Sequence, residues 1–152
     1  MLDAILAWVH FMFIFALSGT VFAEAFFYQQ TLAVATLQRL QRTDIAFGIL
    51  AALVLVSGIL RVVYSPKTPS FYVHDTIFWT KIALFAALGI ASIAPTMHYL
   101  ALNKATPVDG AIAVPESTYK TIRALLTLEI VLLLLIPLCA SLMAHGYGYS
   151  AS

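Results

Sequence analysis

Four long apolar stretches, each long enough to cross a lipid bilayer, constrain the fold of this chain more than any other feature. They cover residues 4–28, 45–64, 76–102 and 118–144. Of the 152 residues, 62% are hydrophobic and only 10% are charged, whereas soluble domains carry about 25% charged residues. The sequence therefore predicts an all-α fold, a bundle of four transmembrane helices that forms a single integral membrane domain over residues 1–152.

Basic residues between the spans predict how the bundle is oriented. Four spans place both termini on one side, and the segments on the opposite side carry five basic residues: Arg39, Arg42, Lys104, Lys120 and Arg123. On the side of the termini, the basic residue outside the membrane is Lys67. Because basic loops stay in the cytoplasm, both termini are expected in the periplasm of a bacterial inner membrane. The net charge of +1 argues against a nucleic-acid partner.

Short motifs predict where the helices begin and where they bend. Thr43 and Asp44 are expected to cap the second helix, and His74-Asp75 to cap the third. Pro95 and Pro137 fall inside the third and fourth spans, where each removes a backbone hydrogen bond and is expected to kink its helix.

Ionisable residues inside the apolar stretches are the candidate functional groups, because hydrocarbon makes them costly. His10 lies about 9 Å into the first span, and Lys81 lies about two turns into the third. Arg61 is near the outer end of the second span. With His74 at the mouth of the third span and His145 after the fourth, these residues predict a cluster in the outer half of the bundle.

Each of these residues also has a purely structural interpretation. His10 could donate a hydrogen bond to a neighbouring backbone, and Arg61 and Lys81 could extend to the headgroups. Glu24 and Glu129 belong to the inner half, where a carboxylate pairs, becomes neutral or relays protons. Glu24 could simply hold helices together, whereas Glu129 has little polar sequence around it and is the stronger functional candidate.

The first functional hypothesis is a membrane redox protein that binds haem b. His10 would ligate the iron, with His74 or His145 as a possible second ligand, and Arg61 and Lys81 would bind the propionates. A pair of histidines at matching depth on facing spans, the strong sign of a four-helix b-type cytochrome, is not present in the sequence.

Catalytic roles in that hypothesis fall to Lys81, which faces the substrate edge, and Glu129, which carries protons inward. If the protein is an enzyme, it would be an oxidoreductase. Two alternatives remain open. Outer histidines above buried carboxylates could guide a cation, a metal ion or protons through the bundle. The polar residues could instead serve helix packing, in an accessory subunit of a larger membrane complex or in a homo-oligomer.

Several segments resemble a bacterial family of predicted inner-membrane proteins without assigned function, and the resemblance covers nearly the whole chain. Its most specific parts are Asp44, Gly58-x-x-Arg61, the run from Phe71 through His74 to Trp79-Thr80-Lys81, and Pro95-Thr96. More remotely, the pattern is similar to the HemJ-type protoporphyrinogen oxidases, four-helix membrane proteins associated with haem b.

The HemJ-type resemblance implies roles for specific positions. That family has a histidine early in the first span and a lysine early in the third, which His10 and Lys81 match, and basic residues before the second span. The end of the first span departs from the family pattern, with Glu24 and Gln29-Gln30 in place of an Arg-x-x-x-Tyr-His ending. The resemblance therefore implies the fold and haem binding more directly than it implies the oxidase activity.

Overall fold

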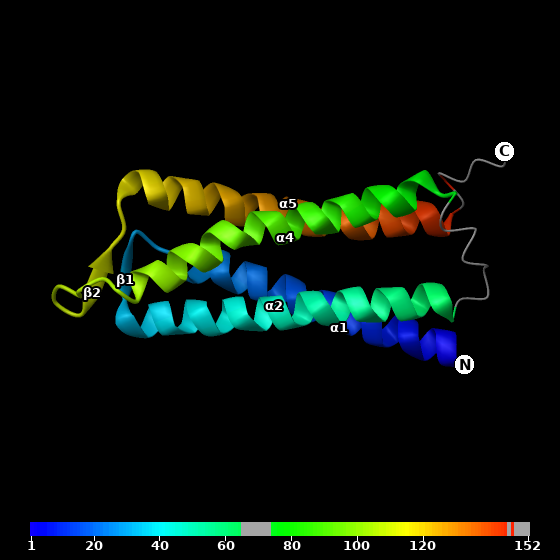
Figure 1. Cartoon of the computed structure of the whole chain (residues 1–152), viewed down its shortest axis with the longest axis horizontal. Helices are drawn as coiled ribbons and strands as arrows, with labels where there is room; N and C mark the ends of the chain where they lie inside the picture. Colours follow the sequence, from blue (N-terminus) through cyan, green and yellow to red (C-terminus); the bar gives the residue numbers. More distant parts are fainter. Residues whose placement is uncertain (65–73, 146, 148–152) are drawn as a thin grey trace.

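The computed structural model describes residues 1–64, 74–145 and 147, and in them the chain forms a bundle of long helices (Figure 1). In chain order the helices are α1 (Leu2–Phe27), α2 (Val34–Val63), α4 (Thr76–Leu102) and α5 (Glu116–Ala144). All four are long and apolar enough to cross a membrane. The predicted all-α four-helix bundle is confirmed, and α1 begins at the same end of the molecule at which α5 finishes.

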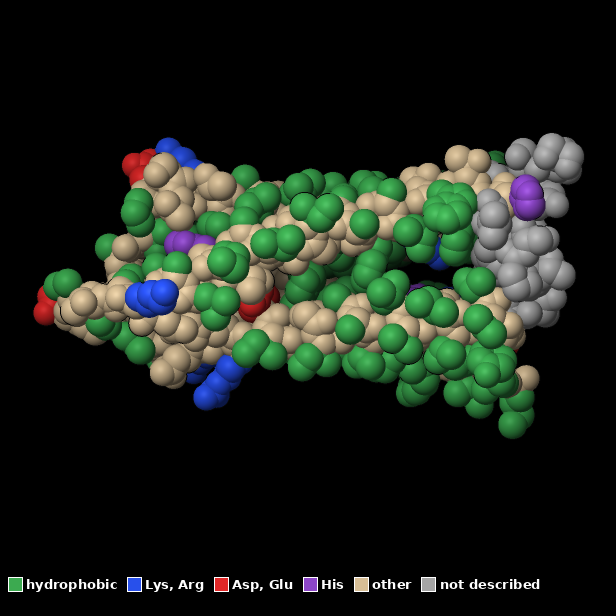
Figure 2. Space-filling view, viewed as in Figure 1, with side chains coloured by type: hydrophobic (Ala, Val, Ile, Leu, Met, Phe, Trp, Pro, Cys, Tyr) green, Lys and Arg blue, Asp and Glu red, His purple; other side chains and the backbone are tan. Residues whose placement is uncertain are grey.

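The helices are arranged as two closely packed pairs. α1 packs mainly against α2, and α4 packs mainly against α5, whereas α1 meets α5 and α2 meets α4 over fewer residues. Much of the outer surface is apolar, as Figure 2 shows, which suits helices that face lipid. The line between α2 and α4 is thus one of the two looser seams of the bundle.

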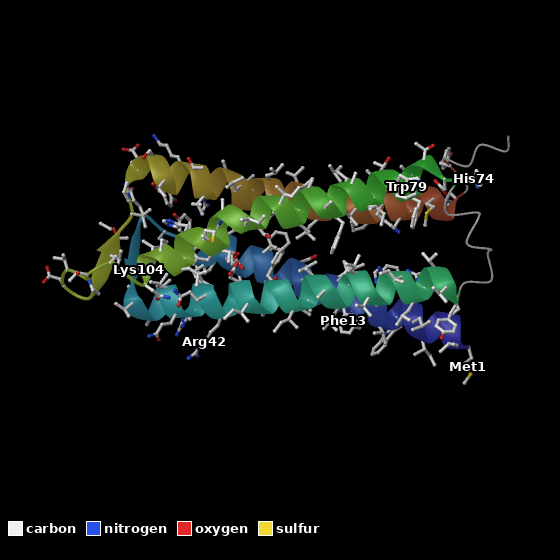
Figure 3. The ribbon with its side chains drawn as sticks, in the orientation of Figure 1. Met1, Phe13, Arg42, His74, Trp79 and Lys104 are labelled. Atoms are coloured by element: carbon white, nitrogen blue, oxygen red, sulfur yellow. The ribbon has the colours of Figure 1, made fainter. Side chains whose placement is uncertain are left out.

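A short antiparallel sheet covers one end of the bundle. Strand β1 (Thr31–Ala33) pairs with β2 (Ala111–Ala113) in the register Thr31 to Ala113. We call this end the sheet end, and the end where α1 begins the terminal end. Lys and Arg side chains gather at the sheet end in Figure 2, and Figure 3 places Arg42 and Lys104 toward it, as the distribution of basic residues predicts.

The second helix begins earlier than the sequence predicts, and the expected cap at Thr43 and Asp44 is wrong. α2 starts at Val34, and its N-cap is Ala33, so both residues lie inside the helix. The reason is burial: Leu37 and Leu40 are covered by the neighbouring elements, which stabilises a helical turn that looks polar in the sequence.

The predicted start of the third helix is confirmed. Asp75 is the N-cap of α4, and its side chain accepts hydrogen bonds from the backbone N–H groups of Ile77, at 2.8 Å, and Phe78, at 3.3 Å. Pro95 and Pro137 both lie within helices, and α4 and α5 continue through them.

Candidate functional site

His10 is held in the bundle by a hydrogen bond from α1 to α2. Its Nδ1 lies 2.8 Å from the hydroxyl oxygen of Ser57, which is 4% exposed. Ser57 in turn donates its hydroxyl proton to backbone carbonyls of its own helix, at 2.7 Å to Leu53 and 3.1 Å to Val54. The proton of the hydroxyl is therefore directed away from the imidazole.

This arrangement favours one tautomer of a neutral His10. Because the Ser57 proton points to the α2 backbone, its oxygen accepts a hydrogen bond from Nδ1–H of the imidazole. Nε2 is then left without a proton and carries a free lone pair. An imidazole oriented in this way, with the other nitrogen hydrogen-bonded, is the usual arrangement of a histidine ligand.

Gly58 allows the imidazole to lie close against α2. A Cβ atom at this position would meet Cε1 of His10 at 3.3 Å, which is closer than ordinary van der Waals contact. Any other residue at position 58 would push against the ring. Ser57 and Gly58, which are adjacent on α2, therefore position His10 together: Ser57 by a hydrogen bond and Gly58 by leaving room for the ring.

Lys81 and Arg61, the two basic residues of the predicted cluster, lie near His10, but their side chains contact aromatic rings on different helices. Lys81 places its Nζ 5.4 Å from the centre of the Phe78 ring on its own helix. Arg61 places its guanidinium 5.7 Å from the centre of the Phe11 ring on α1. The Nε atom of Arg61 is buried without a hydrogen-bond partner. Both cations interact electrostatically with His10, so the structure brings His10, Arg61 and Lys81 together.

A cavity of about 110 Å³ opens beside His10 at the seam between α2 and α4. Its walls are mainly apolar, and all four helices contribute to them, with His10, Gly58, Lys81, Phe85 and Ile136 among the lining residues. Figure 2 shows the surface hollowed here, with histidine and basic side chains inside the recess. Arg61 is not among the described lining residues, since it faces Phe11 instead. We call this space the His10 cavity.

The predicted second ligands lie at the same end but outside the wall of the His10 cavity. His74 is exposed just before α4, as Figure 3 shows, and His145 is exposed at the end of α5. Nδ1 of His145 donates to the carbonyl of Ser141 at 2.8 Å. Among the described residues, neither histidine lines the cavity as it stands.

A second polar cluster lies nearer the sheet end and draws a residue from each helix. Glu24 of α1 and Glu129 of α5 are each 2% exposed, and Tyr99 of α4 is fully buried. Asp44 of α2 accepts a hydrogen bond of 2.7 Å from the hydroxyl of Thr96 on α4. The three carboxyl groups and Tyr99 are close enough to interact electrostatically. We call these five residues the carboxyl cluster.

A layer of apolar side chains separates the carboxyl cluster from the His10 cavity. It is a single packed cluster of buried residues: Leu17, Val21, Phe47, Val54, Leu88, Leu132 and Leu133. On α1 this layer lies between His10 and Glu24, and on α4 it lies between Lys81 and Thr96. Glu129, predicted to act with Lys81, is therefore on the far side of this layer from the cavity.

Comparison with protein families identifies the chain over almost its whole length. Residues 2–148 match the model of a family described as predicted membrane protein (DUF2214). The chain belongs to this family. Neither the curated proteins nor the solved structures contain a match to the sequence or the fold. The description of DUF2214 agrees with the four apolar helices, and it assigns no activity and names no cofactor.

Several residues of this DUF2214 protein that shape the two sites were not singled out by the sequence reasoning. Ser57 was missed because a serine in an apolar span is usually satisfied by its own helix. Tyr99 was not predicted to belong to a site, and Asp44 was predicted only as a helix cap. A partial signal was available: Glu24 and Tyr99 lie near the ends of their predicted spans and Asp44 directly precedes the second span, all on the same side of the bundle.

Proposed function

We propose that this DUF2214 protein is a membrane-embedded redox protein that binds haem b at His10. The observation that carries the proposal is the hydrogen bond from His10 Nδ1 to Ser57, which leaves Nε2 free as an iron ligand. A bound haem b would supply one-electron redox chemistry at this position. The resemblance of His10 and Lys81 to the histidine and lysine of HemJ-type oxidases supports the same assignment.

The surroundings of His10 suit an amphipathic group with acidic substituents. The cavity walls are mainly apolar, and Lys81 adds a cation that would hold a propionate. Arg61 has a buried Nε without a partner, so it would gain a hydrogen bond by turning from Phe11 toward an anion. Leu55 and Ile59 line the cavity and are also 47% and 55% exposed, so the site can be entered from the lipid.

The size of the His10 cavity sets a condition on the proposal. Pockets for ligands of drug size or larger measure roughly 300–1,000 Å³, whereas the cavity measures about 110 Å³. A haem therefore requires α2 and α4 to move apart. These helices meet over few residues, so their seam is the part of the bundle where separation breaks the fewest contacts. His74 or His145, both at this end, would supply a second ligand.

The test is a visible absorption spectrum of the purified protein, produced with ample haem, in the oxidised and the dithionite-reduced state. We expect a Soret band and reduced α and β bands in the wild type. His10→Ala should abolish them, and Ser57→Ala should keep the haem but shift the reduction potential, because the imidazole loses its hydrogen-bond acceptor.

A matched control is His98→Ala, which removes a half-buried histidine at the sheet end and should leave the spectrum unchanged. A wild-type protein that is folded and monodisperse but shows no haem spectrum would overturn the proposal. Retention of the full Soret band in His10→Ala would overturn the assignment of the ligand.

A further inference from the structure

The carboxyl cluster contains buried acidic groups that lack the partners such groups normally have. One oxygen of Glu24 and one of Glu129 are buried without any hydrogen-bond partner. Within the described chain, no lysine or arginine forms an ion pair with Glu24, Asp44 or Glu129; the recorded ion pair, Lys120 with Glu116, lies on the surface at the start of α5. The cluster is therefore rich in acceptors and has no compensating positive charge.

The basic residues that could reach the carboxyl cluster from neighbouring elements are directed elsewhere. Arg123 of α5 is exposed and donates to the carbonyl of Ala25 at 2.9 Å. Arg39 and Arg42 of α2 are exposed. His98 of α4 is half-buried and shares a hydrogen bond of 3.0 Å with the hydroxyl of Tyr28. None of these side chains neutralises the three carboxyl groups.

Buried carboxylates in this situation hold protons. An ionised carboxylate away from water costs several kcal/mol unless it is paired, and like charges at one site oppose each other's ionisation. A metal ion could also compensate the charge, but the described residues include no group of three His, Cys, Asp or Glu side chains arranged to hold one. A proton bound to a carboxyl group compensates its charge without a set of metal ligands.

The phenol of Tyr99 gives the carboxyl cluster a way to change between two states. Its hydroxyl is fully buried among the carboxyl groups and lies within hydrogen-bonding range of the Glu24 side chain, without a hydrogen bond of good geometry. While the glutamates are protonated, this donor has no strong acceptor. When one of them loses its proton, the carboxylate becomes a strong acceptor, and a small side-chain rotation lets Tyr99 donate to it. The phenol thus stabilises the deprotonated form.

We propose that Glu24, Asp44 and Glu129, together with Tyr99, form a proton-binding site that exchanges with the aqueous phase at the sheet end. On uptake, a proton from water binds a carboxylate oxygen and forms a neutral carboxyl group; on release, the proton returns to water. This site is independent of any haem at His10, because the apolar layer separates the two.

The side chains next to Tyr99 explain why protons would exchange with water at the sheet end. Its ring lies 5.9 Å from that of Tyr28, whose hydroxyl is hydrogen-bonded to half-buried His98. The sheet end therefore offers titratable and hydroxyl side chains between the cluster and the surface. In the other direction, buried residues such as Leu17, Leu88 and Leu132 offer none.

Infrared difference spectroscopy of the purified full-length protein tests the proposal. The C=O stretch of a protonated carboxyl group is measured during a pH titration in H₂O and in D₂O. We expect a protonated carboxyl band at neutral pH that shifts in D₂O and weakens as the pH rises. Glu24→Gln and Glu129→Gln should each remove part of the band, whereas Glu116→Gln, which changes an exposed and ion-paired glutamate, should leave it intact.

Two results would overturn the proposal. One is the lack of a protonated carboxyl band in the wild type at neutral pH. The other is a band that survives unchanged in the Glu24→Gln, Glu129→Gln double variant. Tyr99→Phe provides a second measurement that does not remove a carboxyl group: it should keep the band and extend it to higher pH, because the deprotonated state loses its donor. The titration is run on haem-free protein as well, so its outcome is separate from that of the haem proposal.

Discussion

At the scale of single residues, Gly58 and Ser57 decide how His10 is presented to the cavity. Ser57 sets which nitrogen is protonated, and Gly58 sets how close the ring can lie to α2. Both act on His10 from the same turn of α2. The chemistry available at Nε2 therefore depends on residues with no reactivity of their own.

Replacement of Gly58 by alanine tests this role. The new Cβ would lie 3.3 Å from Cε1 of His10, so the ring must shift by a few tenths of an ångström or strain the contact. Gly48→Ala is the matched control, because a Cβ there meets nothing within 4 Å on the same helix. We expect Gly58→Ala to be less stable than Gly48→Ala by about 1 kcal/mol, measured as unfolding in detergent. Equal stability of the two variants would contradict the close contact.

The sequence predicted part of the candidate site at this scale. His10, Arg61 and Lys81 were brought together by an estimate of depth along each span, and depth depends only on residue number. The direction of Arg61 toward Phe11 could not be predicted, since it depends on how α1 and α2 are rotated against each other. The same rotation brings Ser57 to His10. Haem binding at His10 stays a prediction.

At the scale of elements, Asp75 defines where α4 begins and thereby the position of Lys81. The side chain of Asp75 satisfies two backbone N–H groups that a helix start would otherwise leave free. Asp75 is 1% exposed, so water cannot replace it. The first turns of α4, which carry Phe78 and Lys81 into the cavity wall, depend on this cap.

Substitution of Asp75 measures the contribution of the cap. Asp75→Ala should lower the free energy of unfolding by about 1 kcal/mol, because the N–H groups of Ile77 and Phe78 lose their acceptor. Asp75→Asn is expected to retain most of the stability, since an asparagine oxygen accepts the same bonds. Thermal or denaturant unfolding monitored by circular dichroism compares the variants. If Asp75→Asn lowered the free energy of unfolding as much as Asp75→Ala does, the negative charge of Asp75, and not its capping hydrogen bonds, would be the stabilising feature.

The elements missed by sequence reasoning share a physical cause. The first turns of α2 are polar in the sequence, and Leu37 and Leu40 stabilise them only through burial in the tertiary structure. The strands β1 and β2 are three residues each, too short for a periodic pattern. One signal was available: Asp109-Gly110, both with positive φ, forms the tight turn between Val108 and Ala111.

At the scale of the whole molecule, the bundle holds two polar sites at different depths with a dry layer between them. The layer runs through all four helices, and four of its buried residues are leucines, at positions 17, 88, 132 and 133. A transport function would require a polar or hydrated path across it. In the described structure, the His10 cavity lies on the terminal-end side of this layer and the carboxyl cluster lies on its sheet-end side.

Proton flux across vesicles tests this separation. Purified protein is reconstituted into liposomes that contain a pH-sensitive dye, and a potassium diffusion potential is imposed with valinomycin. Because Leu17, Val21, Leu88 and Leu132 offer no hydrogen-bonding groups to a proton, we expect the same proton flux as in protein-free liposomes. A channel-forming peptide serves as the positive control. A flux above that of empty liposomes, lost in Glu129→Gln, would show that the apolar layer opens and would favour proton transport over two separate sites.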